Sequence, residues 1–128
     1  MIAYSMVGTK DLAAAKEFYD AFMPSLDAKH IMGTDRVHFY GNGPGNPMFG
    51  VCTPYDEAHP HPGNGAMTAF ACMTRDAVDA AHAKALELGC EDEGAPGERG
   101  PGGAFYLAYF RDPDGNKMAL FTQAKDGA

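Results

Sequence analysis

Basic side chains are scarce in this sequence. Ten Lys and Arg residues stand against seventeen Asp and Glu residues, which gives a formal net charge of −7. A nucleic-acid-binding protein needs a cationic patch or stripe to neutralise phosphates, and nothing here supplies one. We therefore expect no nucleic-acid partner. The acidic surplus favours solubility, and it also allows a weak attraction for cationic small molecules.

Long apolar runs and paired cysteines are also missing. No apolar run approaches the roughly 20 residues that a membrane-spanning helix needs, so we expect no membrane partner. The N-terminal residues lack the basic and then apolar layout of a signal peptide. The three cysteines, Cys52, Cys72 and Cys90, are far apart and show no metal-binding spacing. Such cysteines are typical of buried side chains in a reducing compartment, and we expect a cytoplasmic protein.

A turn near the C-terminus carries the strongest local signal. Strand-like runs at residues 105–110 and 118–121 flank it. Pro113 favours the second position of such a turn, Asp112 can accept hydrogen bonds from the backbone that follows, and Gly115 tolerates a positive φ. The segment therefore predicts a β-hairpin.

Two helices are predicted, each after a strand and a capping sequence. A strand at residues 2–7 precedes the cap at residues 9–11, and Pro24 ends the first helix. A strand at residues 66–72 precedes the cap at residues 74–76, and Gly89 follows the second helix. Apolar side chains recur at helical spacing in both: Leu12, Ala15, Phe18 or Tyr19, and Phe22, then Val78, Ala81 or His82, Ala85 and Leu88.

The rest of the chain predicts short strands and loops. Three strands are expected at residues 29–32, 36–40 and 48–53, a surface linker at 54–65, a short strand at 90–93 and a Gly/Pro-rich loop up to residue 103. One unit therefore occurs twice, a strand and a helix followed by two or three strands. We predict one α+β domain over residues 1–128, with modules at about 1–56 and 64–124.

The segment at residues 4–12, the pair Phe18-Tyr19 and the turn at 112–116 together resemble the vicinal oxygen chelate superfamily. That group includes glyoxalase I, the bleomycin resistance proteins and the extradiol dioxygenases, and the resemblance covers roughly residues 2–122. The segments 63–65 and 93–97 are similar to a bacterial, glyoxalase-like branch. The resemblance implies two βαβββ modules that form a cup-shaped mixed sheet with helices on its outer face. It also implies a homodimer.

The same resemblance implies four metal-ligand positions, and none of them holds a competent ligand here. The first is Tyr4, the third is Met67 or Ala69, and the last is Ala119, where a glutamate is usual. The second lies within residues 41–55, which contain no His, Asp, Glu or Gln. We therefore predict no metal and no cofactor, and the general base of an isomerase is missing with the glutamate.

An alternative is a lactoylglutathione lyase-like enzyme with shifted metal ligands. His38 with His59 or His61 would be the candidates, provided that His38 points into the cup. The sequence does not fix the face on which His38 lies. If the protein is an enzyme, a glyoxalase-like lyase or isomerase is expected.

Methionine and aromatic side chains are expected on the cup face, beside the four positions where the metal ligands are missing. They predict either a packed core or an apolar pocket for a small organic molecule, with Lys117 and the Tyr4 hydroxyl as polar anchors. The predicted pocket residues are Tyr4, Met6, His38, Met48, Phe49, Met67, Lys117, Ala119 and Phe121.

Overall fold

The computed structural model describes residues 1–125, and the order β-α-β-β-β occurs twice in it. The first unit contains β1 (Tyr4–Gly8), α1 (Leu12–Phe22), the 3₁₀ helix η1 (Met23–Leu26), β2 (Lys29–Gly33), β3 (Val37–Gly41) and β4 (Met48–Cys52). The second contains β5 (Thr68–Ala71), α2 (Arg75–Glu87), β6 (Glu91–Arg99), η2 (Pro101–Gly103), β7 (Phe105–Arg111) and β8 (Lys117–Thr122). The predicted duplication and α+β class are confirmed.

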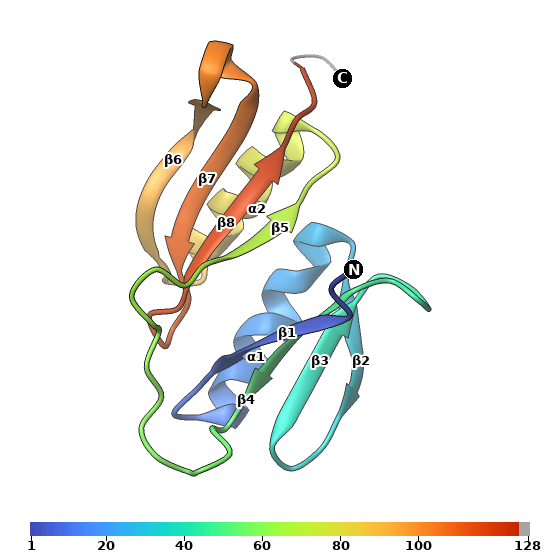
Figure 1. Cartoon of the computed structure of the whole chain (residues 1–128), viewed down its shortest axis with the longest axis vertical. Coiled ribbons are helices and arrows are strands. Elements are labelled where there is room, and N and C mark those ends of the chain that lie inside the picture. Colours follow the sequence, from blue (N-terminus) through green and yellow to red (C-terminus); the bar gives the residue numbers. More distant parts are fainter. Residues whose placement is uncertain (126–128) are drawn as a thin grey trace.

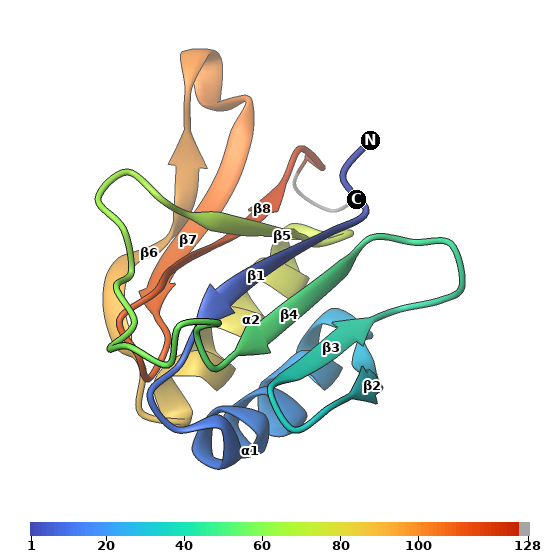
Figure 2. The same cartoon turned by 60° about the horizontal axis from the view of Figure 1, so that its bottom comes forward.

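Each unit forms a four-stranded mixed sheet with the same topology. The strand orders are β1-β4-β3-β2 and β5-β8-β7-β6, and only the β1–β4 and β5–β8 pairs are parallel. The two sheets are not hydrogen-bonded to each other. Their edge strands β1 and β5 lie next to one another at the middle of the molecule (Figure 2).

The predicted caps start both helices. The Asp11 carboxylate accepts a hydrogen bond from the Ala14 N–H at 3.0 Å, and the Thr74 hydroxyl accepts one from the Ala77 N–H at 3.0 Å. Each satisfies a backbone donor that has no partner within its helix. The predicted apolar stripes are buried except at Leu12 and Leu88, which are partly exposed, and His82 lies on the buried side of α2.

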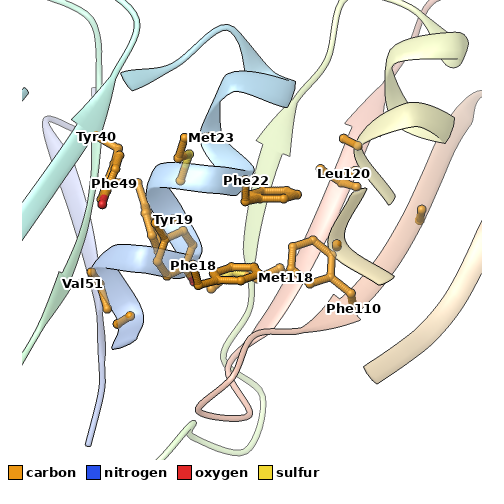
Figure 3. Close-up of a cluster of buried hydrophobic side chains, with 14 of the residues drawn as sticks. Phe18, Tyr19, Phe22, Met23, Tyr40, Phe49, Val51, Phe110, Met118 and Leu120 are labelled. Carbon is orange, nitrogen blue, oxygen red and sulfur yellow. The ribbon is translucent and has the colours of Figure 1, made fainter. Parts of the chain in front are cut away.

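A single core joins the two units, and α1 lies at its centre. Figure 3 shows Phe18, Tyr19 and Phe22 between the side chains of the two sheets. The Phe22 ring lies 5.2 Å from Phe110 of the second sheet, and the Tyr19 ring lies 5.1 Å from Phe49 of the first. These contacts bury α1 against both sheets, so the modules form one packed body.

The predicted hairpin turn also fastens one module to the other. Asp112 is 4% exposed, and its carboxylate accepts hydrogen bonds from the Asp114 and Asn116 N–H groups at 2.9 Å. It accepts two more, from the Tyr19 hydroxyl at 2.7 Å and the Asn116 amide at 3.0 Å. The Asn116 amide also donates to the Gly8 carbonyl at 3.0 Å. The turn therefore contacts both α1 and the end of β1.

The prediction of a Gly/Pro-rich loop up to residue 103 was wrong. A nine-residue strand, β6, runs from Glu91 to Arg99 and pairs with β7, with two irregularities in its register. It is an edge strand, where Pro96 is tolerated because one side of the strand needs no partner. A side chain at Gly94 would collide with the Tyr109 ring, so the glycine lets the strands approach. Glycine and proline on an edge strand thus give the same sequence pattern as a loop.

The connection between the modules, residues 53–67, contains no helix or strand, as predicted for 54–65. None of the helices among residues 1–125 is long and apolar enough to span a membrane.

Replacing Tyr19 by Phe should lower the free energy of unfolding by about 2 kcal/mol, because it removes a buried hydrogen bond to a carboxylate. Tyr4→Phe is the matched control, since the Tyr4 side chain is about half exposed and its hydroxyl has no partner among residues 1–125. Urea denaturation of the two variants measures the difference. Equal losses in both variants would contradict a stabilising role for the Tyr19–Asp112 contact.

Candidate functional site: an inter-module slot and a basic recess

The sheet faces opposite the core carry several of the predicted pocket residues. Tyr4 and Met6 are 52% and 41% exposed, and Tyr4 packs edge-on against Phe39 with ring centroids 5.2 Å apart. A side chain at Gly50 would lie within 3 Å of both Met6 and Phe39, so the glycine makes room for them. In the second sheet Phe121 packs against Phe105 with ring centroids 5.6 Å apart. These faces are apolar and partly open to solvent.

The positions implied for metal ligands do not fit a metal. Tyr4 pairs with Met48 across β1 and β4, and Ala69 pairs with Ala119 across β5 and β8. Ala119 is fully buried. Methyl groups and a thioether offer no hard or borderline donor in place of His or Glu. Within residues 1–125, no three His, Cys, Asp or Glu side chains lie close enough together to hold a metal ion.

His38 lies apart from the other predicted pocket residues. Its Nδ1 is 2.9 Å from Nε2 of His30, and the ring of His30 packs on Tyr40, which is a core residue. Gly33 leaves the space that the histidine pair occupies. His38 and Tyr40 are two residues apart on β3 and therefore share the face that carries α1. His59 and His61 form a separate contact in the linker, with ring centroids 6.1 Å apart.

A cavity, which we name the slot, opens between the two modules. Three of the predicted pocket residues line it: Met48, Phe49 and Met67. It has a volume of about 490 Å³ and lies between the edges of β1 and β5. Most of its wall is apolar, and Ser5, Asn42 and Thr68 supply polar groups. It is lined by Ile2, Ser5, Met23, Leu26, Ala28, Tyr40, Gly41, Asn42, Pro47, Met48, Phe49, Met67, Thr68, Ala69, Phe70 and Ala71. The slot has the size and lining of a small-molecule site.

The linker passes close to the turn between β7 and β8 (Figure 1). Residues of the linker and of these two strands line a second cavity, which we name the basic recess. Its volume is about 610 Å³, and it is lined by residues 62–67 together with Arg111 and Lys117. Met67 lines both the slot and the basic recess. Of the predicted pocket residues, Met48, Phe49 and Met67 line the slot, and Met67 and Lys117 line the recess. Phe49 does not lie on the cup face as predicted, because it packs in the core against Tyr19 of α1.

The sequence argument missed both Arg111 and the recess itself. Arg111 stood next to the predicted turn, but only the register of the hairpin places it directly across from Lys117. Asn64 was visible in a Gly-Asn-Gly segment, yet no local pattern shows that the segment reaches the hairpin.

The paired modules with a slot between them define an α+β domain of the vicinal oxygen chelate type. The chain belongs to the Glyoxalase/Bleomycin resistance protein/Dioxygenase superfamily, whose family model matches residues 1–120. The family named on the basis of the sequence is therefore confirmed.

Solved structures agree with this assignment. A glyoxalase/bleomycin resistance protein from Albidiferax ferrireducens T118 is 36% identical, with 94% of this chain and 97% of that chain covered and a TM-score of 0.84. A lactoylglutathione lyase from Agrobacterium tumefaciens is 21% identical over 94% of this chain and 92% of its own, with a TM-score of 0.68, and shows the fold alone. A comparison with curated proteins finds no match.

Acid should destabilise the protein through His38. Burial, followed by the nearby charge of His30, lowers the pKa of His38 below its usual value near 6.5. The unfolded chain then binds the proton more readily, so the free energy of unfolding should fall as the pH drops below about 6.5. Denaturation in urea at pH 7.5 and 5.5 should show this loss, and His38→Gln should reduce it.

The matched control for that experiment is His61→Gln in the exposed linker, which should leave the pH dependence unchanged. An unaltered pH dependence in the His38 variant would show that other groups are responsible.

Proposed function

We propose that this chain is a metal-independent member of its superfamily that binds a small organic molecule in the inter-module slot. The observation that carries the proposal is the slot itself, about 490 Å³ of largely apolar space bordered by both modules. The absence of competent side chains at the implied ligand positions supports a role without a metal. The name of the Albidiferax relative is compatible with binding as well as with catalysis.

The slot suits a flexible or planar apolar molecule. Met23, Met48 and Met67 contribute adaptable thioether side chains, and Phe49 and Phe70 contribute ring surfaces. Ser5 and Thr68 offer hydroxyl groups on the two edge strands. A ligand there would contact both modules at once, and its affinity would depend on how the modules are packed.

A lactoylglutathione lyase-like activity is the second candidate, and the name of the Agrobacterium structure favours it. It would need His38 together with His59 or His61 as shifted ligands. The contacts of His38 with His30 and of His59 with His61 place these side chains in two separate pairs. Metal-dependent turnover of the methylglyoxal–glutathione hemithioacetal, lost in His38→Ala, would establish this activity.

A neutral aromatic probe, 4-phenylbutyramide, should bind to protein that has been treated with EDTA. The probe should shift the methyl resonances of Met48 and Met67, which line the slot, in protein labelled with [methyl-¹³C]methionine. Met73 is 85% exposed on the surface and should not shift. After incubation with Zn²⁺, Ni²⁺, Fe²⁺ and Mn²⁺ and gel filtration, less than one metal ion per chain should remain.

His59→Ala/His61→Ala is the control for metal held by the exposed linker. One ion per chain, retained by the wild type and by this variant, would overturn the metal-independent proposal. Shifts confined to Met73 would overturn binding in the slot.

We also propose that the protein is a cytoplasmic homodimer. Tyr4, Met6, Met32 and Met67 are all more than 40% exposed, and so many apolar side chains on the surface favour burial against a second copy. Met6 is the best place to test this, because it lies on the open face of β1.

Met6→Glu should convert a dimer into a monomer, since a charge in the middle of an apolar interface is costly to bury. Met73→Glu, at an exposed methionine before α2, should leave the dimer intact. Light scattering after size exclusion gives the mass of each variant. A monomeric wild type at high concentration would contradict the proposal.

A further inference from the structure

The basic recess contains two cations in direct opposition. Arg111 on β7 and Lys117 on β8 are partners in the antiparallel register, so their side chains lie on the same face. Like charges at directly opposed positions repel and weaken the pairing of the strands. The chain retains this pair although it contains only ten basic residues, against seventeen acidic ones.

Arg111 and Lys117 differ in whether a carboxylate neutralises their charge. The Arg111 guanidinium donates to the Glu93 carboxylate at 2.5 Å and to the Gly115 carbonyl at 3.0 Å. The Lys117 ammonium has no carboxylate partner among residues 1–125 and lies 5.3 Å from the centre of the Tyr109 ring. Lys117 is therefore the cation of the recess that can still form an ion pair with a bound anion.

The opposite wall of the recess is a glycine-rich loop. Gly63 and Gly65 have φ values of +86° and +91°, and the Ala66 N–H closes a turn onto the Gly63 carbonyl at 3.2 Å. The N–H groups of Asn64 and Gly65 have no acceptor among the described residues. Both residues are exposed, and successive N–H groups in a turn can form a concave site for an anionic oxygen.

Met67 connects this recess to the slot. It follows the glycine-rich loop directly, and it lines both cavities. A molecule that extends from one cavity to the other would pass the Met67 thioether. It would meet apolar side chains at one end and Lys117 at the other.

We propose that the ligand is an organic carboxylate, whose acid group binds Lys117 in the basic recess and whose apolar part extends past Met67 into the slot. This inference rests on the proposed function and adds the charge of the ligand to it. The carboxylate would relieve the repulsion between Arg111 and Lys117. The Asn64 and Gly65 N–H groups are its additional donors.

Two matched probes test the proposal, 4-phenylbutyrate and its neutral amide. Isothermal titration calorimetry should show that the acid binds the wild type about tenfold more tightly than the amide, because both groups can accept a hydrogen bond from Lys117 but only the acid forms an ion pair with it. Lys117→Gln should abolish that preference. Lys10→Gln, at an exposed lysine outside both cavities, should keep it.

Glu93→Gln gives a second test that does not remove a cation. Losing the Glu93 carboxylate frees the Arg111 guanidinium, so the affinity for 4-phenylbutyrate should rise severalfold while that for the amide stays the same. Added salt should weaken the binding of the acid more than that of the amide.

The outcomes separate this inference from the proposed function. Equal binding of acid and amide, or an acid preference that survives in Lys117→Gln, would overturn the carboxylate site and leave the slot as an apolar site. Binding of neither probe would overturn both. Inorganic phosphate that binds as tightly as 4-phenylbutyrate, with no shift of Met48, would show an anion site unconnected to the slot and would overturn the proposed ligand.

Discussion

One buried carboxylate, Asp112, links the hairpin turn of the second module to the helix of the first. Asp112 holds its own turn through two backbone N–H groups and reaches across the chain to the Tyr19 hydroxyl. Burial raises the pKa of Asp112, and the hydrogen bonds from Asn116 and Tyr19 oppose that rise. The cost of burying the carboxylate is thus offset by four donors. Three of them belong to the turn itself, and the fourth, the Tyr19 hydroxyl, is supplied by the first module.

Much of the fold follows from local chemistry. Asp11 and Thr74 begin helices because their oxygens accept N–H groups of the first turn, and this can be predicted from residue type and spacing. The strand β6 could not be predicted in the same way. Gly94 and Pro96 are ordinary signs of a loop, and only their position at the edge of a sheet, beside Tyr109, makes them acceptable in a strand.

The candidate site was less predictable than the fold. Met48, Phe49 and Met67 line the slot, although Met48 and Phe49 are neighbours on β4 and therefore lie on opposite faces of that strand. Their contact with a ligand stays a prediction. His38 contacts His30 on the neighbouring strand. The β2–β3 register shifts next to His30, and no sequence pattern predicts that shift. Arg111 and Lys117 become a site only through the hairpin register and a linker that is distant in sequence.

The irregular outer strands also limit how copies of this chain can meet. β6 carries Pro96 and an irregular register, and β2, the outer edge of the other sheet, is also interrupted between His30 and Met32. Such edges make poor templates for the backbone of another molecule. Continuous growth of the sheets from chain to chain is thereby discouraged. The homodimer proposed above would therefore form through side chains on the sheet faces and not through strand pairing.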